Sequence, residues 1–181
     1  AKRIITRIGD VFEVQLDNCK KYFQYIANDM TQLNSSVIRT FVEEYLLDYS
    51  PILENITAGK LIFMHISPPM GYSVGFGYKV GRISFEEDVN VLFRTYDEDG
   101  YVPVSKRWLV WKINQPMKFV GELRGENRNA EIGLVINPDE IFERIKSGAY
   151  KTRFHVFNKQ YKYHLFYRQK DNSLKKIKKL E

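Results

Sequence analysis

Hydrophobic and polar residues alternate along the first part of the chain, and this pattern predicts β-strands. From Ile8, the segment IGDVFEVQLDN places positions 11, 13 and 15 on one face and positions 12, 14 and 16 on the other. It ends in an Asp-Asn pair, which favours a turn. The segment KKYFQYIAND follows within a few residues and repeats the two-residue period. The two segments are therefore predicted to form a β-hairpin.

A polar break, NDMTQLNSS, separates this hairpin from VIRTFVEEYL, whose β-branched and aromatic residues predict a third strand. Two interpretations of the break are equally good. As a contact loop, it presents hydrogen-bonding side chains to a partner, namely Asn28, Asp29, Thr31, Gln32, Asn34 and Ser35. As a plain connection, it satisfies its own backbone through Asx and Ser/Thr turns.

Further extended segments are predicted along the rest of the chain: KLIFMHIS, ISFEEDVNVLFRTY, RWLVWKI, MKFVGEL and AEIGLVI. The sequence Asp97-Glu98-Asp99-Gly100 predicts a hairpin turn between two of them. A last hairpin is predicted across KTRFHVFNKQYKYHLFYR, with its turn at positions 158–160.

Two short segments carry helix signals. The first is SPILENITAG, in which Ser50 is the expected N-cap, Pro51 the first helical residue and Gly59 the C-terminal cap. The second is a helix over residues 138–147, capped by Asn137 and stopped by Gly148. Apolar residues at positions 141, 142, 145 and 149 form one stripe of it, so this helix is expected to pack one face on the sheet.

These elements predict an α+β fold, with a strongly bent, mainly antiparallel β-sheet that is barrel-like or sandwich-like and two short helices. A chain of 181 residues with 44% hydrophobic composition is long enough to bury one sizeable core. We expect a single globular β-rich domain over residues 1–168, followed by a basic C-terminal end at 169–181.

Cysteine content and apolar run lengths give an expectation for the compartment. The single cysteine, Cys19, excludes an intrachain disulfide, and neither a signal-peptide pattern nor an apolar run of about 18 residues is present. We therefore expect a cytoplasmic protein that does not bind membranes.

The net charge of +6 is concentrated at the C-terminal end. Residues 1–150 contain 18 Lys and Arg against 20 Asp and Glu, which gives −2, whereas residues 151–181 contain 10 against 2, which gives +8. Such an end attracts nucleic acid or acidic proteins, and it also keeps a surface soluble, which is the interpretation we favour.

No constellation in the sequence predicts catalysis, a metal or a cofactor. The glycines of GFGYKVG have the spacing GxGxxxG and precede an extended segment, so they predict bulges or bends rather than a phosphate loop. Lys20 and Lys21 could lower the pKa of Cys19, but no GxSxG turn and no HExxH or CxxC spacing accompanies it. We expect no enzymatic activity, no cofactor and no metal site.

The basic and aromatic residues near the C-terminus support an alternative function, nucleic-acid binding. Cationic side chains would contact phosphates and aromatic rings would stack on bases; the residues concerned are Arg153, Lys159, Lys162, Tyr163, Arg168 and Lys170. Alternation instead places Tyr161, Tyr163, Leu165 and Tyr167 on one face, as a core-facing strand requires, and this interpretation is favoured.

The order IGDVFEVQL, YFQYI, SSVIRTF, GYKVG and the region of Trp108 and Trp111 resembles the immunity protein 26 family of bacterial polymorphic-toxin systems. The resemblance covers about the first two thirds of the chain. The Gly9-Asp10 pair looks like the early turn of that family, and residues 77–81 look like its Gly-aromatic-Lys-x-Gly segment, with Tyr78 at a position where Trp is expected. The resemblance implies a small intracellular protein that binds and neutralises a cognate toxin.

A toxin that cleaves nucleic acid has a basic substrate site, so acidic residues of an inhibitor would be useful contacts. Two acidic groups flank one predicted strand, and they are expected to join the polar break as partner-binding residues: Glu86, Glu87, Asp88, Asp97, Glu98 and Asp99. The predicted partner is a cognate toxin protein.

Overall fold

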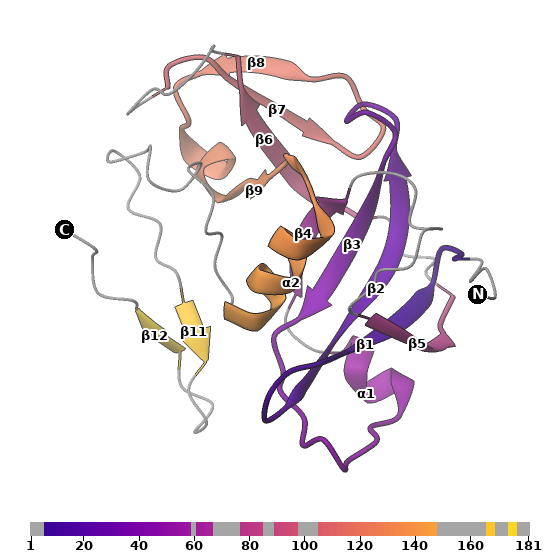
Figure 1. The fold of residues 1–181 in the computed structure, drawn as a ribbon. Coiled ribbons are helices and arrows are strands. Elements are labelled where there is room, and N and C mark those ends of the chain that lie inside the picture. Colours follow the sequence, from indigo (N-terminus) through magenta and orange to yellow (C-terminus); the bar gives the residue numbers. More distant parts are fainter. Residues whose placement is uncertain are drawn as a thin grey trace.

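The computed structural model has an α+β fold, which confirms the predicted class (Figure 1). It consists mostly of β-sheet, with two α-helices and one short 3₁₀ helix in the part of the chain that is described. The structure describes residues 6–58, 61–66, 77–84, 89–97, 105–147, 166–168 and 174–176, with the backbone alone at 61–66, 166–168 and 174–176.

The larger sheet has six strands in the order β10-β4-β3-β2-β1-β5. Neighbours in this sheet are antiparallel except β10 and β4, which are parallel. The strands are β1 (Asp10–Gln15), β2 (Lys20–Asp29), β3 (Ser35–Phe41), β4 (Leu61–Ile66), β5 (Gly77–Arg82) and β10 (Val135–Ile136). The predicted first hairpin is confirmed as β1 and β2, which pair Phe12 with Phe23.

The second sheet has four strands in the order β8-β7-β6-β9, and β6 and β9 are parallel. Its strands are β6 (Leu92–Tyr96), β7 (Trp108–Lys112), β8 (Lys118–Gly121) and β9 (Glu131–Ile132). The 3₁₀ helix η1 (Gly125–Asn129) connects β8 to β9. A separate antiparallel pair is formed by β11 (Phe166–Arg168) and β12 (Leu174–Lys176).

The two helices differ in how well their local signals set their ends. Helix α2 (Pro138–Ser147) has the predicted bounds, and the Asn137 side chain accepts a hydrogen bond from the backbone N–H of Glu140 at 2.9 Å. Helix α1 (Leu53–Thr57) begins after Ile52, so the predicted N-cap at Ser50 is wrong. The predicted stops at Gly59 and Gly148 lie outside the described residues.

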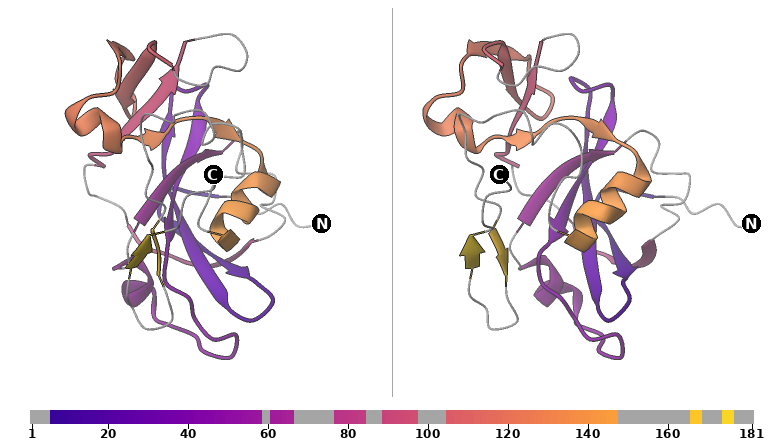
Figure 2. Two further views of the ribbon diagram at one scale, coloured as in Figure 1. Left: turned by 90° about the vertical axis from the view of Figure 1, so that its left-hand side faces the viewer. Right: turned by 60° about the vertical axis from the view of Figure 1, so that its left-hand side comes forward.

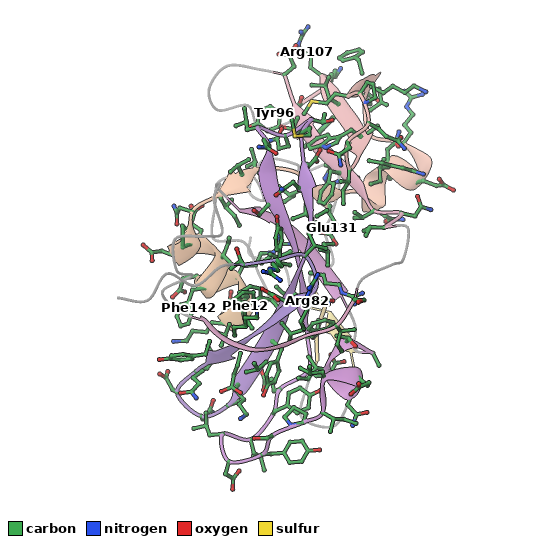
Figure 3. The ribbon with its side chains drawn as sticks, turned by 90° about the vertical axis from the view of Figure 1, so that its right-hand side faces the viewer. Phe12, Arg82, Tyr96, Arg107, Glu131 and Phe142 are labelled. Carbon is green, nitrogen blue, oxygen red and sulfur yellow. The ribbon has the colours of Figure 1, made fainter. Side chains whose placement is uncertain are left out.

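The core is built on both faces of the six-stranded sheet (Figure 2). One face packs against α2, where Phe12 and Phe142 lie close together (Figure 3). The opposite face packs against the four-stranded sheet at one end of β2 and β3, through Val37 and Phe93, and against α1 at the other end, through Ile56.

Several predicted strand bounds are wrong, because pairing between segments far apart in the sequence determines where the strands end. The predicted bent, mainly antiparallel β-structure is present, but it is divided between two principal sheets, and in the described part of the chain neither closes into a barrel. The third strand ends at Phe41, and the strand predicted at 83–96 begins only at Leu92. The segment AEIGLVI is divided between β9 and β10, which belong to different sheets.

Gly133, between β9 and β10, is expected to tolerate no side chain. A Cβ at this position would lie 2.5 Å from Trp111 Cζ2 and 3.1 Å from Phe93 Cβ, in the interface between the sheets. We therefore expect Gly133→Ala to lower the free energy of unfolding by about 1–2 kcal/mol, measured by denaturant titration. The control is Gly125→Ala, at φ +53° with no atom within 4 Å of the added carbon, which measures backbone strain alone. A loss below about 0.5 kcal/mol for Gly133→Ala would contradict this prediction.

Candidate protein-contact surface

A buried carboxylate fixes the turn between β2 and β3, which contains most of the polar break. Asp29 is the last residue of β2, and its side chain is fully buried. Its Oδ2 accepts a hydrogen bond from the indole Nε1–H of Trp111 at 2.8 Å. Its Oδ1 accepts bonds from the backbone N–H groups of Thr31 at 3.1 Å and Asn114 at 3.0 Å. Asp29 therefore ties the six-stranded sheet to β7 and to the turn that follows β7.

The two turns also bond each other directly. The Asn114 side chain accepts a hydrogen bond from the N–H of Met30 at 2.8 Å, and the Thr31 hydroxyl donates to the carbonyl of Gln115 at 2.9 Å. The Gln32 side-chain amide donates to the carbonyl of Gly133 at 2.6 Å. We call residues 30–34 together with 113–117 the paired-turn tip, which lies at one end of the β2–β3 hairpin (Figure 1).

The paired-turn tip holds all three of the non-glycine residues with positive φ among the described residues. These are Leu33 at +55°, Asn34 at +51° and Asn114 at +59°. Asparagine adopts this conformation readily, because its side chain can form hydrogen bonds with the nearby backbone. For leucine the same conformation is sterically unfavourable by about 1–2 kcal/mol. The hydrogen bonds across the two turns keep Leu33 in this unfavourable conformation.

Two large apolar side chains project from this rigid tip into solvent. Leu33 is 75% exposed and Met30 is 68% exposed. At the base of the tip, Ile113 and Met117 pack on the buried cluster between the two sheets. The surface thus combines a hydrogen-bonded backbone and exposed apolar side chains with a base that packs on the buried cluster between the sheets.

The residues predicted as a contact loop divide into exposed and structural ones. Asn28 and Asn34 are exposed, and Asn28 also accepts a hydrogen bond from the Tyr25 hydroxyl at 2.7 Å. Thr31 and Gln32 are half-buried; Thr31 bonds across the tip to Gln115, and Gln32 bonds to Gly133 outside the tip. The prediction that Asp29 is a displayed contact is wrong, because its carboxylate is used inside the protein. Ser35 is buried as well.

Most of the predicted acidic contacts and most of the predicted nucleic-acid contacts lie outside the described residues: Glu86, Glu87, Asp88, Glu98, Asp99, Arg153, Lys159, Lys162, Tyr163 and Lys170. Asp97 is described, and its carboxylate lies 2.7 Å from Nη2 of the exposed Arg107. Arg168 lies in β11 opposite Leu174 of β12. The predicted turn at 97–100 is only partly described, and the connection from β6 to β7 extends from Asp97 to Arg107.

The features considered for catalysis have structural roles where they are described. Burial, together with the charges of Glu44 and Asp17, raises the pKa of the Cys19 thiol. Lys21 acts in the suggested direction and lowers this pKa, but its effect is smaller than that of burial. Gly77 and Gly81 lie in β5, whose pairing with β1 is irregular between Val11 and Phe12. Among the described residues, no group of three or more His, Cys, Asp or Glu could hold a metal ion.

Two buried ionic clusters were not predicted from the sequence. Glu13 accepts a hydrogen bond from the Tyr22 hydroxyl at 2.8 Å and lies 3.2 Å from Lys20 Nζ. Glu131 of β9 lies 3.5 Å from Nη2 of the buried Arg144 of α2. Their partners are distant in sequence or sit on different elements, so residue spacing alone gives no signal for them.

Burial dominates the electrostatics of the second cluster. It lowers the pKa of the Arg144 guanidinium to about 9, although the Glu131 charge opposes this change. Burial also raises the pKa of Glu131 against the opposing charges of Arg144 and Arg94. The cluster joins the four-stranded sheet to α2, and burial disfavours the charged form of both of its members.

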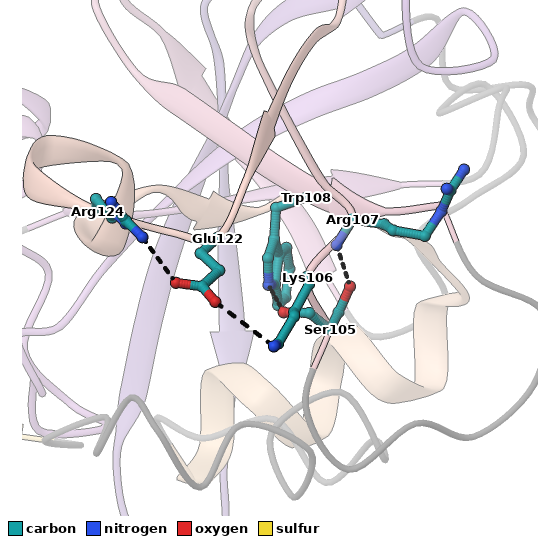
Figure 4. A network of polar contacts seen from close by, with 6 residues as sticks. All are labelled: Ser105, Lys106, Arg107, Trp108, Glu122 and Arg124. Carbon is teal, nitrogen blue, oxygen red and sulfur yellow. Dashed lines mark hydrogen bonds and ion pairs between the residues drawn. The ribbon is translucent and has the colours of Figure 1, made fainter.

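A more exposed polar network lies on the four-stranded sheet (Figure 4). The Glu122 carboxylate is 3.1 Å from Arg124 Nη2 and 3.9 Å from Lys106 Nζ, and both cations are well exposed. The Trp108 indole donates to the carbonyl of Ser105 at 3.0 Å. Exposed ion pairs of this kind add little stability. The two bonds to Ser105, from the Trp108 indole and from the backbone N–H of Arg107, hold the chain where it enters β7.

Comparison with known proteins gave no match to any family model, any curated protein or any solved structure. In the described part of the chain, no helix has the length and apolar character needed to cross a membrane. The geometry of the described residues therefore carries the functional argument.

Proposed function

We propose that this protein is an immunity-type inhibitor that binds and neutralises a cognate bacterial toxin by protein–protein contact at the paired-turn tip. The carrying observation is Leu33, which is 75% exposed and held at φ +55°. A stable fold gains nothing from an apolar side chain in this position. The sequence resemblance to the immunity protein 26 family supports the same function.

Preorganisation is the physical advantage of such a tip. Every loop and side chain that becomes ordered on binding loses conformational entropy, which weakens association. A tip that Asp29 and Asn114 already fix avoids much of that loss. Exposed Met30 and Leu33 would fill apolar pockets on the toxin, as the central residues of an interface do.

The predicted polar contacts fit around this apolar centre as a rim. Protein–protein interfaces typically have a desolvated centre surrounded by polar groups that stay accessible to solvent. In this proposal Asn28, Asn34, Thr31 and Gln32 form that rim. The acidic residues at 86–88 and 97–99 remain proposed contacts for a toxin with a basic substrate site.

The test begins with capture of the toxin from native cells on the tagged protein, after nuclease treatment, followed by calorimetry with the purified pair. We expect Met30→Gln with Leu33→Asn to weaken binding by about tenfold or more, because apolar anchors are lost while asparagine keeps the positive φ. It should also abolish protection of cells that express the toxin. The matched control is Phe119→Gln, an exposed apolar residue on β8. Equal affinities for the wild-type protein and the tip variant would contradict the proposal.

An alternative function is nucleic-acid binding through the basic C-terminal end. The observation that favours it is the β11–β12 pair, which places Tyr167 opposite Lys175 and Phe166 opposite Lys176, within a segment of net charge +8. Arg153, Lys159, Lys162, Tyr163, Arg168 and Lys170 would then contact the nucleic acid. This alternative requires affinity for RNA or DNA that falls steeply with salt, and salt-insensitive or undetectable binding of the full chain would exclude it.

A further inference from the structure

We propose that the segment between β3 and α1 is a second contact surface, which binds a basic protein segment that carries apolar side chains. We call residues 44–54 the acidic ridge. It lies at the opposite end of the β2–β3 hairpin from the paired-turn tip, as Figures 1 and 2 show. The inference does not depend on the proposed toxin, because it rests on a different surface.

The acidic ridge exposes four large apolar side chains within seven positions. Leu46 is 68% exposed, Leu47 46%, Tyr49 51% and Ile52 62%. Scattered apolar residues on a surface need no explanation, whereas a contiguous group rimmed by polar residues marks an interaction site. Four such residues lie in one short connection that also exposes Asp48 and Glu54.

The backbone of the acidic ridge is held against the six-stranded sheet. Tyr45 and Lys20 exchange two backbone hydrogen bonds of 2.9 Å, and the Tyr45 ring packs edge-on against buried Tyr22 with centroids 5.4 Å apart. The Tyr49 ring stacks on the Tyr45 ring with centroids 6.2 Å apart, and the backbone N–H of Tyr49 donates to the Leu46 carbonyl at 3.2 Å. The exposed apolar groups are therefore presented on a fixed frame.

Charge identifies the kind of partner. Residues 40–59 contain four acidic residues and no Lys or Arg, so this stretch carries −4 on a chain of net charge +6. Glu44 pairs with Lys21 at 3.2 Å. Asp48 and Glu54 are exposed and have no ion pair with any described residue. Lysine or arginine of a partner would complement these two carboxylates while its apolar side chains cover Leu46 and Ile52.

The test uses two fluorescent probe peptides with the same leucine pattern, one carrying lysine and the other carrying glutamate at the polar positions. Binding to the full chain is measured by anisotropy. The lysine peptide is expected to bind at least about tenfold more tightly than the glutamate peptide. The affinity of the lysine peptide should fall about tenfold for the double variant Asp48→Asn plus Glu54→Gln. A separate double variant, Leu46→Gln plus Ile52→Gln, should lower it by a similar factor. All four side chains are solvent-exposed, so thermal unfolding of these variants should match that of the wild-type protein.

Matched controls remove the same groups elsewhere on the surface. Glu126→Gln plus Asp139→Asn changes net charge equally, and Phe119→Gln removes an exposed apolar side chain. These controls should change affinity less than twofold. Equal losses in the control and ridge variants would overturn the proposal, because they would indicate non-specific attraction. Self-association that sedimentation velocity shows to depend on Leu46 and Asp48 would also overturn it, because the occupant would then be a second copy of the chain.

Discussion

Replacing Asp29 with alanine is expected to lower the free energy of unfolding by about 3–4 kcal/mol, because three buried or half-buried donors lose a charged acceptor. The donors are the Trp111 indole and the backbone N–H groups of Thr31 and Asn114. Water can reach the turns more easily than the indole, which is 2% exposed. The indole N–H that loses this acceptor should therefore account for much of the loss.

A double-mutant cycle separates this hydrogen bond from the rest of the effect. In a Trp111→Phe background, the donor is absent, so Asp29→Ala should cost less by about 1.5–3 kcal/mol than in the wild-type protein. Asp29→Asn keeps one acceptor oxygen and should fall between wild type and alanine. Denaturant titration gives each value. A loss below about 1 kcal/mol for Asp29→Ala would show that Asp29 does not hold the sheets together.

The same substitution connects stability to the proposed function. Without Asp29, Met30 and Leu33 would remain in the sequence, but the paired-turn tip would lose its fixed geometry. Affinity for the toxin should fall even though no exposed side chain has changed, because ordering the tip becomes part of the cost of binding. The proposed function thus predicts that stability and affinity fall together when this buried side chain is removed.

Local signals explain which parts of the fold could be predicted from the sequence. The Asn137-Pro138 pair and the acidic residues that follow it gave the correct bounds of α2, because capping depends on a few neighbouring residues. The first hairpin was also predicted correctly, since β1 and β2 alternate cleanly across a short turn. The prediction of an N-cap at Ser50 was wrong although Pro51 follows it, because the packing of Leu53 and Ile56 determines where α1 begins.

Long-range pairing explains what the sequence could not reveal. A polar loop with Asp29 is typical of a solvent-facing connection, but its indole partner Trp111 lies 82 positions away in the chain. Alternation also gives no sign that one short segment, AEIGLVI, contributes a strand to each of two sheets. The exposed Met30 and Leu33 lay within the predicted polar break, yet its apolar residues were not included among the predicted contacts. An apolar residue inside a polar turn is the signal that could have identified them.

The acidic ridge was missed for a related reason. Residues 43–46 continue the pattern of β3, and this predicted a longer strand rather than an exposed connection. The chain instead leaves the sheet after Phe41 and returns at Tyr45 to pair with Lys20. That bridge leads directly to the buried network of Glu13, Lys20 and Tyr22 beneath the ridge.

Replacing Glu13 with glutamine is expected to lower the free energy of unfolding by about 2–3 kcal/mol at pH 7, because it leaves a buried ammonium without its carboxylate. The side chains of Lys20 and Glu13 are only 5% and 12% exposed, and their charged atoms lie 3.2 Å apart. Tyr22→Phe is the matched control: it removes the 2.8 Å hydroxyl bond to Glu13 but keeps the ion pair, so it should cost about 1 kcal/mol.

The pH dependence distinguishes the lost charge from a general packing defect. Burial alone would raise the pKa of Glu13, but hydrogen bonds from Gln15, Tyr22 and Lys20 together with the Lys20 charge lower it below 4.5. The ionised form is therefore bound more tightly in the folded state, and its contribution is present above pH 4.5 and is lost as pH falls through the folded pKa. The stability gap between the wild-type protein and Glu13→Gln should narrow in acid, whereas the gap to Tyr22→Phe should change less. A Glu13→Gln gap that stays constant from pH 7 to about pH 3 would show that the charge of Glu13 contributes nothing to stability.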